Sequence, residues 1–153
     1  MNIPAIRLHC QQLAKPMFTD AQSVVKWMGA MQAQQPSMAK LALAIRIRGG
    51  NLQQVEQAID QGRVLRTHVM RPTWHYVAPD DIRWMLALSR DRLKAAYASL
   101  VKTHGICITE HMYDEFNLQL HDMLVGGKSL TKRQIADQLA GTGIPTENVF
   151  LTR

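Results

Sequence analysis

Met31-Gln32-Ala33-Gln34-Gln35-Pro36 lies between two segments whose apolar residues recur at helical spacing. The residues before it predict a helix over about 21–32, and those after it predict a helix over about 38–47. The first helix would carry Gln32 and Gln34 near its C-terminal end, just ahead of a turn bounded by proline. Each glutamine amide has two donors and an acceptor oxygen, so the pair can hold a water molecule or a polar ligand. Neither amide is a strong base.

A pair of glutamines one residue apart is a weak signal on its own. The chain has thirteen glutamines, including Gln11-Gln12 and Gln53-Gln54, so the ordinary interpretation of Gln32 and Gln34 is a solvated helix end. A functional interpretation therefore depends on the segments that surround the pair.

Further along the chain the apolar pattern changes its period. Residues 64–70 and 73–77 are rich in β-branched and aromatic side chains, and only Arg71-Pro72 separates them. This pattern predicts two short strands joined in a β-hairpin. Helices followed by such a hairpin are typical of a winged helix, the helix-turn-helix variant with a β wing. The sequence thus predicts a mainly α chain with a small β-hairpin, an α+β winged helix-turn-helix.

Cap and terminator residues predict the remaining helices. These helices cover 3–14, Asn51 to Gly62, Ala78-Pro79 to about residue 102, Thr109 to Gly126-Gly127, and Thr131 to Gly141. Ser89-Arg90 is a candidate break in the longest of them, and residues 144–147 start one more. We assign 1–90 to a first winged-helix domain, and 91–153 to linking helices and the start of a second, incomplete one. A helix-turn-helix interrupted in this way predicts a truncated larger protein or a short relative of one.

The net charge of +6 is concentrated in the first half of the chain. Residues 1–50 hold six Lys or Arg against the single acid Asp20, whereas residues 78–153 hold nine of each sign. This asymmetry favours a polyanion such as nucleic acid as the partner, with a solvated basic face as the alternative.

Other sequence features set limits on location and cofactors. No apolar run approaches the roughly 18 residues that span a bilayer, and the N-terminus lacks a signal-peptide pattern. Cys10 and Cys107 have no metal-ligand spacing. We therefore expect a cytoplasmic protein without membrane association or bound metal.

With these segments in this order, the chain resembles the winged-helix DNA glycosylases of the AlkZ and YcaQ type, which act on alkylated and crosslinked bases. Gly29 to Gln34 is similar to the family's Gln-x-Gln signature, Gly62 to Val77 to its hairpin, and Asp80 to Trp84 to the helix after the hairpin. Leu130 to Leu139 is similar to the start of a second winged helix. The resemblance covers most of the chain and is most specific over 27–86. Pro72 departs from it, because the family's hairpin turn more usually has Gly.

This resemblance implies a monofunctional glycosylase that hydrolyses the N-glycosidic bond of N7-alkylated or crosslinked purines in double-stranded DNA, without a cofactor. An N7-alkylated purine is cationic and already a good leaving group. The remaining needs are an oriented water and a stabilised oxocarbenium-like sugar, which neutral amide dipoles supply. Gln32 and Gln34 are the expected catalytic pair, one placing the water and the other steadying the sugar, with the assignment between them open.

The same resemblance and the basic charge suggest the side chains that contact DNA. These are Lys40, Arg46, Arg48, Arg66, Arg71, Trp74 and His75. Trp74 either wedges at a base step or packs in the core, and His75 is either structural or part of the site. The alternative function is a non-catalytic winged-helix DNA-binding regulator, or an inactive truncated domain, in which both glutamines are only polar surface.

Overall fold

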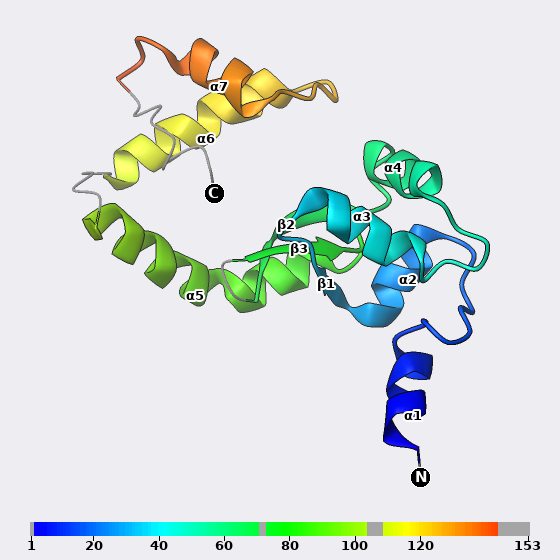
Figure 1. Cartoon of the computed structure of the whole chain (residues 1–153). Helices are drawn as coiled ribbons and strands as arrows, with labels where there is room; N and C mark the ends of the chain where they lie inside the picture. Colours follow the sequence, from blue (N-terminus) through cyan, green and yellow to red (C-terminus); the bar gives the residue numbers. More distant parts are fainter. Residues whose placement is uncertain (1, 71–72, 104–108, 144–153) are drawn as a thin grey trace. The chain divides into compact units, whose positions relative to one another are not determined.

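The structure, a computed structural model, describes residues 2–70, 73–103 and 109–143 (Figure 1). The chain divides into two compact units, residues 1–97 and 98–153. The elements in order are α1 (Ile3–Cys10), α2 (Ala21–Met28), β1 (Ala30–Gln32), α3 (Pro36–Ala44), α4 (Leu52–Asp60), β2 (Leu65–Val69), β3 (Thr73–Val77), α5 (Ile82–Thr103), α6 (Glu110–Leu124) and α7 (Lys132–Leu139). Among these described helices, none combines the length and apolar character needed to cross a membrane.

The first unit has the topology of a winged helix. Its elements run helix, strand, helix, helix, strand, strand, from α2 to β3 (Figure 1). The three strands form an antiparallel sheet in the order β1-β3-β2. Val77 of the central strand β3 lies between Ala30 of β1 and Leu65 of β2, opposite both. Helices α3 and α4 form the helix-turn-helix, and β2 and β3 form the wing. The predicted α+β winged helix is confirmed.

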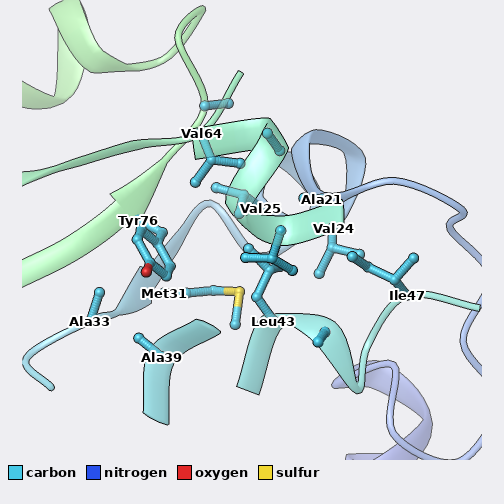
Figure 2. Close-up of a cluster of buried hydrophobic side chains, with 14 residues drawn as sticks. Ala21, Val24, Val25, Met31, Ala33, Ala39, Leu43, Ile47, Val64 and Tyr76 are labelled. Atoms are coloured by element: carbon cyan, nitrogen blue, oxygen red, sulfur yellow. The ribbon is translucent and has the colours of Figure 1, made fainter. Parts of the chain in front are cut away.

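The sheet is packed on both faces. On one face, Tyr76, Met31 and Ala33 join a core formed with α2, α3 and α4, in which Leu43 and Val25 are fully buried (Figure 2). Each large apolar side chain buried in this way contributes about 1.5–3 kcal/mol. The other face holds a smaller cluster of Val69 and Val77 against Met85 of α5. The central strand β3 is therefore fixed from both sides.

The predicted helix over 21–32 is wrong beyond Met28. Gly29 has φ 73° and ψ −71°, a conformation that side-chain-bearing residues rarely adopt, and it ends α2. Ala30 to Gln32 then pair with β3 as a strand. Met31 continues the helical stripe in sequence but reaches the core from β1. The Gln-x-Gln run consequently lies on and just past a strand instead of at a helix end.

Two further boundaries differ from the sequence prediction. Helix α1 ends at Cys10, because Gln12 has φ 59° and a fully buried side chain whose Oε1 accepts from the backbone N–H of Met17 at 2.9 Å. Helix α5 begins at Ile82 and runs without a break at Ser89. The buried Ser89 hydroxyl donates to the Met85 carbonyl at 2.7 Å and accepts from the Met70 N–H at 2.6 Å. It therefore ties the end of β2 to α5.

Several local cap predictions are confirmed. Asn51 and Gln54 form a capping box at α4, Thr131 and Gln134 form one at α7, and Thr109 caps α6. Helix α3 covers Pro36–Ala44, two residues earlier at its start and three at its end than the helix over about 38–47 predicted from sequence. The predicted helix start at 144–147, Cys107 and the Arg71-Pro72 turn lie outside the described residues. The division into domains at residues 90 and 91 stays a prediction.

Candidate functional site

Gln32 is exposed on β1, an edge strand of the sheet. Its neighbours Met31 and Ala33 are buried, as the alternation of a strand requires. Gln32 lies opposite His75 of β3, and His75 lies opposite Thr67 of β2. These three side chains form a polar row across one face of the sheet. Gln32 makes no side-chain hydrogen bond with the described residues, so its amide keeps both its donors and its acceptor for a ligand.

The His75 ring is bonded to its own strand. Its Nδ1 lies 2.8 Å from the backbone carbonyl of Thr73. A carbonyl oxygen only accepts, so Nδ1 is the donor in this bond. The bond holds the ring of His75 in place beside Gln32 in the row.

Gln34 is bound into the end of the sheet by its side chain. The backbone N–H of Ala33 donates to the Trp74 carbonyl at 2.7 Å, as in a regular ladder. The N–H of Trp74 instead donates to Oε1 of Gln34, at 3.3 Å. The Gln34 amide oxygen thus takes the place of a backbone carbonyl. This bond uses one of the two lone pairs of the amide oxygen, while the –NH₂ group has no partner among the described residues.

Arg66 reaches from β2 to the residues just after β1. Its Nε donates to the carbonyl of Ala33 at 2.9 Å, and its Nη2 donates to the carbonyl of Gln34 at 3.3 Å. Its guanidinium carbon lies 4.2 Å from the centre of the Trp74 ring, a cation–π distance. The His68 ring lies 3.9 Å from the same indole. Arg66, Gln34 and Trp74 therefore form one contact cluster, which we call the Arg66 cluster.

Three of the remaining predicted DNA contacts lie on α3 and in the turn after it. Lys40 pairs with Glu56 of α4 at 2.8 Å, and this hydrogen bond raises the pKa of Lys40. Arg46 donates through Nη1 to the Ala42 carbonyl at 2.6 Å, its Nε has no acceptor among the described residues, and burial lowers its pKa. Arg48 is exposed. Arg71 is outside the described residues.

The structure gathers the predicted residues only in part. The sheet brings Gln34, Arg66 and Trp74 together, and places Gln32 beside His75. Lys40, Arg46 and Arg48 belong to the helix-turn-helix instead. Sequence reasoning missed the bonds between Arg66 and the Gln-x-Gln segment, since 32 and 33 residues separate the partners. No local pattern reports a contact over that separation.

The second helix of the helix-turn-helix is acidic. Helix α4 carries Glu56 and Asp60 and has no Lys or Arg, while Gln53 and Gln57 are exposed on it. In most helix-turn-helix proteins this helix enters the major groove. Among the described residues, moreover, no group of His, Cys, Asp and Glu side chains could hold a metal ion. The chain thus contains a winged helix whose candidate polar residues Gln32 and His75 lie on its sheet.

Comparison with known proteins identifies the family. The family model described as DNA glycosylase AlkZ-like matches residues 25–149. The chain belongs to this AlkZ-like DNA glycosylase family, as its sequence resemblance predicted. The solved structure of Streptomyces sahachiroi DNA glycosylase AlkZ has the same fold, with a TM-score of 0.66 at 23% identity. That match covers 95% of this chain and 37% of AlkZ, so the chain spans well under half of that structure. No curated protein matches the chain significantly.

Proposed function

We propose that this chain carries the catalytic segment of a DNA glycosylase that hydrolyses the N-glycosidic bond of N7-alkylated or crosslinked purines in double-stranded DNA. The observation that carries the proposal is the Gln-x-Gln segment itself, held on a rigid sheet edge within a chain of this family. Rigid elements position catalytic groups more precisely than loops do.

The proposed reaction needs little acid–base chemistry. The bond between the sugar C1′ and the cationic base breaks, and the base leaves with the bonding electrons and becomes neutral. Water then adds to C1′ of the oxocarbenium-like sugar and loses a proton to solvent. The protein has to orient that water and stabilise the positive charge on the sugar. Amide groups are suited to both tasks.

The contacts of the two glutamines suggest different roles. Gln32 retains a free acceptor oxygen, which would accept a hydrogen bond from the attacking water and turn the water's lone pair toward C1′. Gln34 has its oxygen engaged by Trp74, so it would donate through its –NH₂ group to a phosphate or sugar oxygen of the same nucleotide. Gln32 would thus place the water, and Gln34 would hold the sugar.

DNA binding would draw on the basic first half of the chain. We propose that Arg48 and Arg71 contact phosphates, with Lys40 and Arg46 contributing positive charge from the helix-turn-helix. Consecutive strand residues point to opposite faces of the sheet, so His75 would contact the nucleotide from the face that carries Gln32, and Trp74 would contact DNA from the other face. Such binding depends little on sequence and falls steeply with salt, because phosphate contacts release counterions.

The test is release of N7-methylguanine from alkylated duplex DNA by this chain. The parent should release the base, and Gln32→Ala should release it far more slowly while binding the duplex equally well. Gln53→Ala on α4 is the matched control, since Gln53 is another exposed glutamine of the same winged helix. Salt-dependent binding without base release would favour the non-catalytic DNA-binding function, because the bond from Trp74 to Gln34 Oε1 gives Gln34 a structural role of its own.

A further inference from the structure

We propose that Arg66 is a positioning residue of this site: it fixes the backbone of Gln34 and thereby aims the Gln34 amide, in place of contacting a phosphate. The inference rests on the proposed function and adds to it a residue that acts through another. Sequence reasoning assigned Arg66 to the DNA surface with the other basic side chains.

The geometry of the two carbonyls carries the inference. The Ala33 carbonyl belongs to the peptide group before the Gln34 Cα, and the Gln34 carbonyl belongs to the peptide group after it. Arg66 donates to both, at 2.9 and 3.3 Å. Fixing the two peptide planes around one Cα fixes the direction in which its side chain leaves the backbone. Arg66 therefore sets the direction of the Gln34 side chain without touching that side chain.

The far end of the Gln34 side chain is fixed by the same cluster. Its Oε1 is held by the N–H of Trp74 at 3.3 Å, and the Trp74 ring lies under the Arg66 guanidinium at 4.2 Å. Arg66 thus contacts the residue that bears the amide and the residue that anchors it. The backbone and the amide oxygen of Gln34 are both defined before any ligand arrives.

An arginine side chain can fill this role, whereas a lysine side chain cannot. A planar guanidinium presents N–H donors in a fixed fork, so it can bond two neighbouring carbonyls and stack on an indole at once. A lysine ammonium is a point charge on a flexible stem and does not reproduce this arrangement.

Three variants separate positioning from phosphate binding. Arg66→Met removes the charge and the donors, whereas Arg66→Lys keeps the charge and loses the fork. Arg63→Met is the matched control, because Arg63 is an exposed arginine just before the same strand. Unfolding curves and exchange of the α2 amides check that each variant is folded. If Arg66→Met does not fold, Arg66→Lys carries the test.

The first readout needs neither DNA nor activity. Hydrogen exchange of the Trp74 backbone amide reports its bond to Gln34, and it should speed up roughly tenfold or more in Arg66→Met and Arg66→Lys as that bond opens locally. Arg63→Met should leave it unchanged. A Trp74 amide that exchanges at the parent rate in both Arg66 variants would overturn the proposal.

The second readout divides binding from chemistry. Positioning predicts that both Arg66 variants lose about a hundredfold in the single-turnover rate of N7-methylguanine release, as for a misplaced reactive group, while duplex affinity changes little. A phosphate contact predicts the reverse: Arg66→Met would lower the salt slope by about 0.9, and Arg66→Lys would behave like the parent. That reversed pattern would overturn the proposal.

The two readouts also keep this inference distinct from the proposed function. A parent chain that releases no base at all would contradict the proposed function, and with it the catalytic meaning of the Arg66 cluster. The exchange result would still show whether Arg66 fixes Gln34. Base release by the parent, with parent-like rates in both Arg66 variants, would overturn the positioning role alone.

Discussion

The side-chain oxygen of Gln34 accepts a hydrogen bond from the backbone amide of Trp74, 40 residues further along the chain, at 3.3 Å. Gln34 therefore takes part in the sheet through its side chain, whereas Gln32 takes part only through its backbone. Two residues that look equivalent in sequence have different surroundings in the fold. Substitutions at the two positions should accordingly have different effects on stability.

Loss of the Gln34 side chain should destabilise the fold more than loss of Gln32. Gln34→Ala removes the acceptor of the Trp74 N–H, and a bond of this kind contributes about 1 kcal/mol. Gln32→Ala removes an exposed side chain and should change the free energy of unfolding by no more than about 0.5 kcal/mol. Urea unfolding measures both, with Gln57→Ala as the exposed control. Equal effects at positions 32 and 34 would contradict the structural role of Gln34.

Substitution of either glutamine should slow base release. Removing one preorganised contact to a transition state costs on the order of 3 kcal/mol, roughly a hundredfold in rate. Gln32→Ala and Gln34→Ala should each show such a loss in single-turnover release, with duplex affinity nearly unchanged. Because both act on one transition state, the double variant should lose less than the product of the single losses. Wild-type release by both single variants would remove the catalytic assignment.

Gly29 should tolerate no other residue well. A methyl group there meets no atom within 4 Å, so the cost of Gly29→Ala comes from the backbone at φ 73° alone, about 1–3 kcal/mol. Asn often replaces Gly in the left-handed helical region, but ψ −71° lies outside that region. Gly29→Asn should therefore be no better than Gly29→Ala. At Gly62, just after the end of α4 with φ 68°, Asn should cost less than Ala. Thermal unfolding of the four variants tests this contrast.

Stability should fall at alkaline pH partly through Tyr76. Burial raises the pKa of this phenol, and the positive charges of Arg66 and Lys40 oppose the shift. A raised pKa means that the folded chain holds the proton more tightly than the unfolded one, so the contribution is complete below about pH 10 and is lost as pH rises through the folded pKa. Tyr76→Phe should flatten this decline in urea unfolding. Some decline should persist in the variant, since the pKa values of Lys26 and Lys40 are also raised and their ion pairs weaken in the same range.

Local signals in the sequence predicted the helices well. The capping boxes at Asn51 and Thr131 depend on residues three apart, and the ends of α4 and α6 are marked by nearby glycines. The β-hairpin was also predictable, because only three residues of sequence separate its two strands. Each of these features depends on residues close in sequence.

The site itself was less predictable. Ala30 to Gln32 form a strand because they pair with Val77 to His75, more than 40 residues away, and Met31 fits a helical stripe equally well. Gly29 was a visible signal for a helix end, but only pairing with β3 makes the next three residues a strand. The buried Gln12 and the bonds of Arg66 to Ala33 and Gln34 are likewise long-range or turn contacts that leave no periodic trace. The sequence could thus propose the residues of the candidate site, while their geometry needed the structure.

Helix α4 also has a consequence for the kinetics of encounter with DNA. Helix α4 contains Glu56 and Asp60 and no basic residue. Lys40, the basic residue of α3, is paired with Glu56. Under the proposed function, a duplex that approaches α4 meets repulsion, whereas one that approaches the exposed Arg48 meets attraction. The electrostatic field would then favour some approach directions over others before any contact forms, over a distance of about 8 Å at physiological ionic strength. Added salt would screen this field. The association rate constant should therefore fall at a lower salt concentration than the one at which the bound complex loses its contacts.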